Sequence, residues 1–135
     1  MSTEAEPVGV GQDVRLVVHV SLEMVRLYKE DFGRPKSAQT YWAGPDTLVV
    51  LLEDTLTPAE REMVEIGEHK RLRDKRATMQ YSKVREFCEP VERITGRKVR
   101  AFLSSTDTEV DGLSLETFVL HAPGYDGPSR IDAEH

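Results

Sequence analysis

Residues 40–52, with the sequence TYWAGPDTLVVLL, indicate the fold more clearly than any other stretch of the chain. Aromatic and β-branched residues on either side of Gly44-Pro45-Asp46 are typical of two strands joined by a tight turn. The second strand, residues 47–52, is apolar at nearly every position, as strands in the middle of a sheet commonly are. We therefore expect it to be covered on both faces, by helices or by a partner subunit.

The segment before this hairpin, residues 13–32, has the spacing of an amphipathic helix. Its apolar residues are separated by three and four positions: Val14, Val17, Met24, Tyr28 and Phe32, bridged by Ser21. Gly33-Arg34-Pro35 would end the helix. Residues 16–22 also alternate in a way that fits a strand, so a strand remains an alternative there, with the helix favoured.

The segment after the hairpin begins with a helix-start signal, Thr57-Pro58-Ala59-Glu60. Thr can cap the helix, Pro is tolerated at its first position, and Glu can return the capping hydrogen bond. Four glutamates and then the basic run Lys70–Arg76 would match the helix dipole if the helix broke near the end of that run. Apolar spacing continues to Gly96, which predicts one long helix or two in series, with a kink at Pro90.

After Gly96 the pattern changes to a period of two residues, which predicts two more strands. Val99, Ala101 and Leu103 would share one face, and Leu113, Leu115, Thr117 and Val119 another. The connection Ser104–Gly112 is polar and expected to be exposed. The predicted fold class is α+β with two layers: a mostly antiparallel four-stranded sheet with helices on one face, in the order α-β-β-α(α)-β-β.

The length and composition fit one soluble domain. A chain of 135 residues is sufficient for one core, and 39% hydrophobic and 31% charged residues are ordinary for a globular protein. We expect a domain over residues 13–122 between flexible tails, 1–12 and 123–135. The acidic N-terminus does not resemble a secretory signal, and no apolar run is long enough to span a bilayer, so a cytoplasmic location is expected.

Several short fragments, taken together in their order and spacing, resemble the MpsC-like family of small bacterial proteins. These are residues 28–30, 32–34, 51–54, 56–61, 95–99 and 102–104. The family is named for a sodium-translocating, membrane-potential-generating system whose other components are linked to inorganic carbon uptake. The resemblance, over about residues 13–121, implies an accessory role, a membrane transport protein as partner and a location peripheral to the inner membrane. It brings no catalytic residues.

The residue types that usually form metal or catalytic sites are sparse. None of the four histidines stands three or four positions from another, and Cys88 is the only cysteine. Cys88 falls on an apolar stripe, where a thiol packs as a small hydrophobe. The glycines are dispersed and form no phosphate loop. We therefore expect no metal and no cofactor.

Charged residues suggest two candidate ligand sites, apart from the basic run Lys70–Arg76. Arg34-Pro35-Lys36 and Arg97-Lys98 could gather around a small anion such as bicarbonate or phosphate, if the fold brings them together. A pocket across a subunit boundary could instead use Glu53, Arg97 and the segment Ser104–Asp107. Separately, the pair Glu53-Asp54 at the end of a strand could bind a cation or act as acid and base. The candidate ligand-binding residues are thus Arg34, Lys36, Glu53, Arg97, Lys98, Ser104 and Asp107.

The run Lys70–Arg76 could touch nucleic acid or an anionic membrane. The formal net charge of −6 and the absence of interleaved aromatics argue against nucleic acid. We favour a non-enzymatic accessory, regulatory or assembly domain that forms a homodimer, because a monomer of this size would struggle to cover the apolar strand 48–52. A small-anion-binding protein or enzyme and a nucleic-acid-binding protein are the alternatives.

Overall fold

The computed structural model describes the backbone of residues 6–133 and the side chains of residues 13–133. Along the chain the elements are α1 (Glu6–Asp31), β1 (Ser37–Trp42), β2 (Thr47–Glu53), α2 (Pro58–Glu65), α3 (His69–Tyr81), α4 (Val84–Thr95), β3 (Val99–Thr106), β4 (Ser114–Leu120) and a short 3-10 helix, η2 (Arg130–Ala133). The strands form one sheet in the order β1-β2-β4-β3, and every neighbouring pair is antiparallel. The predicted α+β class is confirmed.

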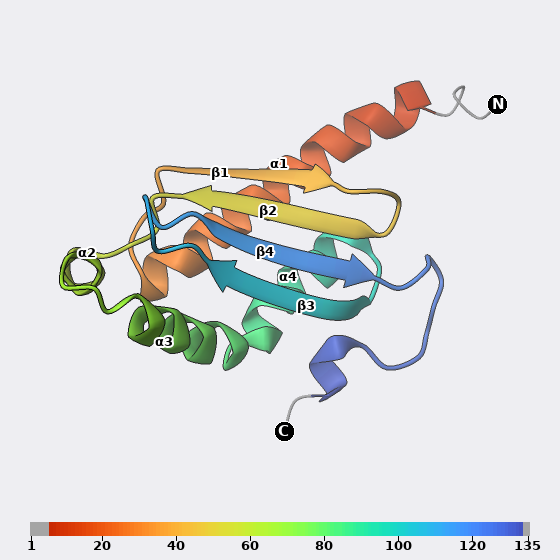
Figure 1. The fold of residues 1–135 in the computed structure, drawn as a ribbon. Coiled ribbons are helices and arrows are strands. Elements are labelled where there is room, and N and C mark those ends of the chain that lie inside the picture. The colour runs from red at the N-terminus through yellow and green to blue at the C-terminus, as the bar shows by residue number, and fades with distance from the viewer. Residues whose placement is uncertain (1–5, 134–135) are drawn as a thin grey trace.

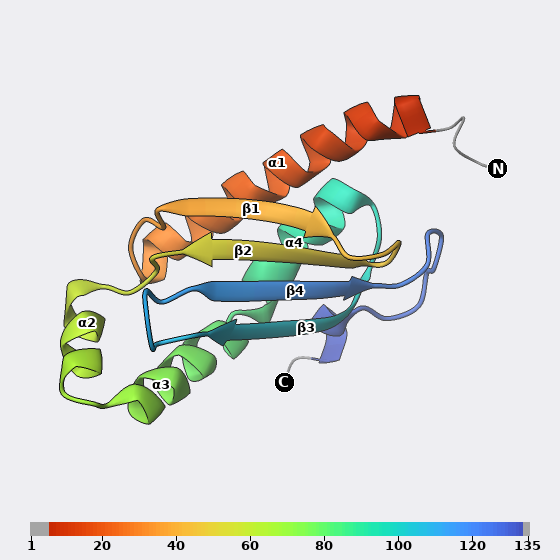
Figure 2. The same cartoon turned by 45° about the horizontal axis from the view of Figure 1, so that its top comes forward.

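The molecule has two layers (Figures 1 and 2). Helices α1 and α4 cross one face of the sheet, and α3 lies beside β3 near the end where α2 is found. We call this helix-covered side the inner face and the opposite side the outer face. The N-terminal end of α1 projects past the edge formed by β1.

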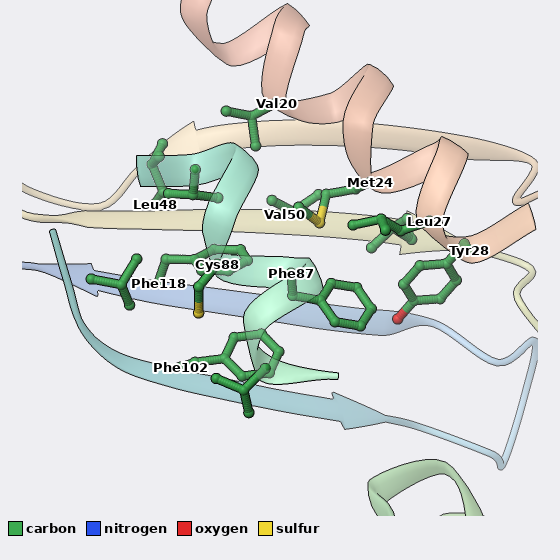
Figure 3. Packing of buried hydrophobic residues seen from close by; sticks show 14 of the residues in the cluster. Val20, Met24, Leu27, Tyr28, Leu48, Val50, Phe87, Cys88, Phe102 and Phe118 are labelled. Carbon is green, nitrogen blue, oxygen red and sulfur yellow. The ribbon is translucent and has the colours of Figure 1, made fainter. Parts of the chain in front are cut away.

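The apolar core fills the space between the inner face and the helices (Figure 3). Met24 of α1 lies beside Val50 of β2, and the Tyr28 ring lies 6.2 Å from that of Phe87, centre to centre. Phe87 of α4 in turn stacks on Phe102 of β3 with ring centroids 5.6 Å apart. Cys88 is buried in this cluster, which confirms its predicted packing role. Burying one such large side chain stabilises the fold by roughly 1.5–3 kcal/mol.

Residues 13–31 are helical, so the favoured helix is confirmed over the strand alternative. Helix α1 begins at Glu6, earlier than the expected domain start at 13, while residues 1–5 lie outside the described part. Met24, Tyr28 and Phe32 are buried as predicted, but Val14 is 55% exposed. Val14 instead shares an exposed stripe of α1 with Val18 and Leu22, while Leu16 and Val17 pack partly buried against the core.

The helical region after the hairpin is three helices, not one or two. Thr57 caps α2 with the predicted capping box, complete in both directions. The first break falls at Gly67, before the basic run, so the predicted match of charges to one helix dipole is wrong. The second break separates α3 from α4 at residues 82–83, and α4 continues through Pro90 until Gly96, whose φ of 70° ends it.

The inner and outer faces of β3 and β4 differ from the prediction. A bulge between Val99 and Ala101 shifts the alternation, so Val99 and Phe102 both face the core while Leu103 is exposed. On β4 the buried residues are Ser114, Glu116, Phe118 and Leu120. The apolar set predicted for that strand, Leu115, Thr117 and Val119, is only half-buried and lies on the outer face.

Strand β2 is central, as predicted, but the described chain covers only one of its faces. Leu48, Val50 and Leu52 are fully buried beneath the helices, whereas the alternate residues are half-buried. No helix among the described residues lies over the outer face (Figures 1 and 2). The expected helical cover on both sides is therefore absent from the described part of the chain.

The segment after β4 differs from the expected tail. It turns at residues 123–128 and returns to α4 and β3, where Ile131 of η2 is buried in the core cluster. Lys98 Nζ donates to the backbone carbonyls of Asp126 and Gly127, at 3.2 and 2.5 Å. The Ile131 side chain, these hydrogen bonds and the stacking of Tyr125 on His121 hold residues 123–133 against the domain.

Candidate functional site

The two predicted cationic segments lie at opposite ends of the sheet. Lys36 directly precedes β1, and its backbone N–H donates to Glu53 O at 2.9 Å. Arg97 instead lies at the β1–β2 turn, where its guanidinium donates to Pro45 O and Asp46 Oδ1 at 2.9 and 2.5 Å. A six-residue strand is roughly 20 Å long. Within one chain the fold therefore keeps the two cationic segments apart, at opposite ends of the sheet.

Both cations of the second segment have structural partners. Arg97 Nε and Nη2 donate to His121 O at 2.9 and 2.7 Å, so this side chain ties β4's exit to the hairpin turn. Lys98 holds the C-terminal segment, as described above. At the other end, Arg34 and Lys36 are exposed.

The residues predicted for a pocket at a subunit boundary also point in different directions. Glu53 Oε1 accepts a hydrogen bond from Ser37 Oγ at 2.5 Å, and Asp54 pairs with Arg61, so the acid pair is split. Ser104 is buried on the inner face, whereas Asp107 is exposed in the loop after β3. These groups do not converge on one cleft.

The basic run Lys70–Arg76 is largely used in ion pairs. Lys70 pairs with Asp74 at 2.8 Å, Arg71 Nη1 lies 4.0 Å from Glu68 Oε1, and Arg73 Nη1 lies 4.0 Å from Glu109 Oε2. Arg76 is only 1% exposed, so it cannot reach an external phosphate. The run does not form the continuous basic stripe that polyanion binding would require.

The buried Arg76 forms a charged pair with Glu60, which is 0% exposed. Arg76 Nε and Nη2 donate to Glu60 Oε2 and Oε1, both at 2.8 Å, in the bidentate geometry that makes such pairs strong. Burial raises the pKa of Glu60, but hydrogen bonds from Arg76 and from the Thr57 backbone N–H outweigh it and lower the pKa to about 2. The pair links α2, which carries Glu60, to α3, which carries Arg76.

Arg76 also links this pair to the sheet. Its Nη1 donates to Thr55 Oγ1 at 3.3 Å, and Thr55 Oγ1 in turn lies 3.0 Å from Ser114 Oγ on β4. The guanidinium carbon sits 3.8 Å from the centre of the Phe32 ring. Such cation–π stacking is stronger in a desolvated site. The Arg76 side chain of α3 thus contacts Glu60 of α2, Phe32 just after α1 and Thr55 just after β2.

A second buried carboxylate, Glu116 on β4, lies nearer the middle of the inner face and has different neighbours. Tyr28 OH donates to Glu116 Oε2, and Gln80 Nε2 donates to the same oxygen at 3.0 Å. Glu116 forms no salt bridge with any cation of residues 13–133. Burial raises its pKa to about 7, against the lowering effect of Ser104, Tyr28, Gln80 and Arg76.

Sequence reasoning missed both buried carboxylates. Glu60 was identified only as a capping residue, and Glu116 not at all. The available signal for Glu116 was the alternation of β4, which places Ser114, Glu116 and Phe118 on one face. A polar residue between apolar ones on a strand usually indicates a solvent-facing position, and here that rule selects the wrong face.

The outer face offers a surface of a different kind. Its central rows, read across the sheet from the pairing register, are Tyr41-Val49-Thr117-Leu103 and Gln39-Leu51-Leu115-Ser105. Tyr41 is 51% and Leu103 54% exposed. An apolar centre with uncharged polar residues at the margins has the anatomy of a protein interface.

A second apolar surface lies at the β1 edge. Val14, Val18 and Leu22 form an exposed stripe on α1 at spacings of four. Beside it, a groove of about 380 Å³ separates α1 from β1. The groove is lined by Val17, Val18, Ser21, Leu22, Ala38, Gln39, Thr40 and Tyr41.

Within residues 13–133, histidine, cysteine and acidic side chains do not form a group that could hold a metal ion. His69 Nδ1 lies 2.8 Å from Thr108 Oγ1, and His121 stacks on Tyr125. In the described part of the chain, none of the helices combines the length and apolarity needed to cross a bilayer.

Comparison with known proteins places the chain in one family. Neither the search of curated proteins nor the search of solved structures gave a match. The family model described as "Na+-translocating membrane potential-generating system (MpsC)" matches residues 14–122. Because this match spans the sheet and its covering helices, the chain belongs to the MpsC family, as the sequence fragments indicate.

Proposed function

We propose that this protein is a non-enzymatic accessory domain that works by contact: it forms a homodimer through the outer face of its sheet and serves a membrane ion or inorganic-carbon transport system from the cytoplasmic surface of the inner membrane. The observation that carries the proposal is the uncovered apolar centre of the outer face. The membrane system is taken from the description of the family.

A second copy of the chain suits this surface. A two-fold dimer needs a patch that can pack against itself, and the two central rows contain no charged residue that would repel its own copy. Two such faces can pack as a sandwich with their strands at about 30°. Edge residues such as Gln39 and Ser105 would then form the polar rim.

The size of the face sets the expected affinity. Four strands about 4.8 Å apart, with about six residues each at 3.3 Å, give a projected area on the order of 400 Å². Specific interfaces usually bury about 800 Å² per partner. We therefore expect a dimer that dissociates in the micromolar range.

The rival functions have less support. An enzyme or anion binder would need converging charged groups, but Glu53, Arg97 and Ser104 lie on different faces or ends of the sheet. Nucleic-acid binding would need the cations of α3 to be free, and Arg76 is buried against Glu60.

Sedimentation velocity across the micromolar range tests the dimer. Leu103→Lys and Tyr41→Lys each place a charge on the outer face, so each should dissociate the dimer. Both residues are exposed in the single chain, so the resulting monomer should remain folded. Ile66→Lys, at a residue 75% exposed beside α2, is the matched control and should remain dimeric.

Two outcomes would contradict the proposal. A wild-type monomer at high micromolar concentration would remove the homodimer. Dissociation by Leu22→Glu on the α1 stripe, with Leu103→Lys still dimeric, would move the interface to the groove beside β1.

A further inference from the structure

Glu116 is an ionisable group placed where a charge is costly. It lies on a central strand, is 0% exposed, and is paired across the sheet with Val50 on one side and Ser104 on the other. A buried carboxylate without a bonded cation loses its hydration with no opposite charge to compensate, so its neutral form is favoured.

The hydrogen bonds around Glu116 are incomplete in a specific way. Oε2 accepts from Tyr28 OH and Gln80 Nε2, but three further oxygens have no partner among the described residues: Glu116 Oε1, Gln80 Oε1 and Ser104 Oγ. In the ionised state Glu116 Oε1 and Gln80 Oε1 can only accept, and the Ser104 hydroxyl hydrogen is the one donor among these three groups, whose interaction with the carboxylate lowers the pKa of Glu116. A proton on Glu116 Oε1 would add the missing donor.

The charged and titratable groups packed around Glu116 do not compensate a negative charge. From α1 comes the Tyr28 phenol, whose own pKa is raised by burial and by Glu116. From α3 comes Arg76, which is already bound to Glu60 in bidentate geometry. The titratable group that α4 contributes to the core is the Cys88 thiol, while β2 and β3 present Val50 and Ser104.

We propose that Glu116 is a proton-binding site inside the fold, occupied on the acidic side of neutrality and vacated on the alkaline side, and that its ionisation lowers the stability of the folded state, because the buried charge has no bonded cation within residues 13–133. Tyr28 of α1 and Gln80 of α3 both bond the same carboxylate oxygen. Gln80 Nε2 also donates to Tyr28 OH at 3.0 Å, so the carboxylate, the phenol and the amide form one closed triangle. A change at Glu116 therefore reaches both helices. The site does not depend on the homodimer.

The sign of the pH effect follows from proton linkage. The folded protein holds the proton up to a pH near 7, whereas the unfolded chain releases it near 4.5. The stabilisation is fully present below pH 4.5 and is lost as the pH rises through 7. Between these values the unfolding equilibrium constant should rise by up to tenfold per pH unit.

The test compares denaturant unfolding of the full chain from pH 5 to 8 with that of Glu116→Gln, a neutral side chain of the same shape. Wild type should lose stability over this range, by several tens of fold in the unfolding constant, and the variant should lack that loss. Glu53→Gln, which removes a carboxylate from the outer face of the neighbouring strand, is the control and should keep the wild-type profile. Parallel profiles for wild type and Glu116→Gln would overturn the proposal.

Carbon-13 NMR titration of the wild-type side-chain carboxyls gives an answer that needs no variant. The Glu116 signal should titrate with a midpoint near pH 7, and the Gln80 side-chain amide should shift with the same midpoint. A Glu116 midpoint near 4.5, or a Gln80 amide that does not respond, would rule out the proton site.

Discussion

The two faces of the sheet are built from the same strands but use their residues for different purposes. The inner face carries Phe118 and Leu48 in the core, together with the buried polar groups of Glu116 and Ser114. The outer face has apolar central rows and no buried carboxylate. On β4 the outward-facing set, Leu115, Thr117 and Val119, has no charged residue, whereas the buried set includes Ser114 and Glu116. The difference teaches that the more apolar side of a strand is not always its core side, because helices bring hydrogen-bonding partners that make polar residues tolerable beneath them.

If the inner face stabilises the monomer and the outer face the dimer, truncation in the core should have the largest effect on monomer stability. Phe118→Ala removes a fully buried ring that lies 5.2 Å from Phe102, centre to centre. We expect a loss of about 3–5 kcal/mol, measured by urea unfolding at one protein concentration.

Leu115→Ala is the matched comparison, because Leu115 lies on the same strand, β4, but on its outer face. Its cost should be smaller and should grow with protein concentration, since the wild-type side chain is half-buried in the monomer and covered in the dimer. Equal, concentration-independent losses at both positions would abolish the distinction between the faces.

Breaking the buried ion pair should have the next largest effect. Arg76→Leu leaves Glu60 without its bidentate partner in a site closed to water, at a cost of roughly 3–5 kcal/mol. Lys75→Met is the control, because Lys75 Nζ also reaches Glu60 Oε2, at 3.2 Å, but its side chain is 46% exposed. Its loss should stay below about 1 kcal/mol, and chemical denaturation at pH 7 measures both.

Tyr28→Phe tests whether the Tyr28 phenol acts through the Glu116 carboxylate. It removes one donor to the carboxylate while the ring keeps its packing against Phe87. We expect a loss of about 1–2 kcal/mol at pH 8, where Glu116 is ionised, and a smaller loss at pH 5. The pKa of Glu116 should also move upward, because Tyr28 lowers it in wild type. A loss independent of pH would show that the phenol does not act through the carboxylate.

The smallest effect on monomer stability is expected from Leu103→Lys on the outer face. An exposed substitution of this kind usually changes the free energy of unfolding by less than about 0.5 kcal/mol. Measured well below the dimer dissociation constant, its unfolding should match that of wild type. A large loss there would mean that Leu103 belongs to the monomer's own core.

Much of the fold was predictable because its signals are local. The hairpin around Gly44-Pro45-Asp46 and the capping box at Thr57 each depend on residues a few positions apart. The helix break at Gly67 was missed because the change from acidic to basic residues over 60–76 was interpreted as the charge pattern of one helix. The break at residues 82–83 was missed because the apolar spacing continued across it. The bulge after Val99 was missed because one extra residue reverses the alternation without changing composition.

The buried polar groups could not be predicted from neighbours in sequence. Arg76 looks like part of a solvated basic run, and only its contact with Glu60, sixteen positions away, shows that it is buried. Glu116 depends on Tyr28, eighty-eight positions away, and on Gln80. The separation of Lys36 and Arg97 could not be predicted for the converse reason, since their similar charges carry no information about which end of the sheet each residue occupies.

The central claim, that the outer faces of two copies pack together, is tested most directly by pulsed electron paramagnetic resonance with a spin label at Ser105→Cys. Ser105 lies at the exposed margin of the outer face, and the native Cys88 is buried and should resist labelling. Facing sheets pack about 10 Å apart, so the account predicts a short label-to-label distance, no more than about 30 Å, that disappears in Leu103→Lys. Absence of any dipolar coupling at high micromolar concentration, or a distance unaffected by that substitution, would contradict it.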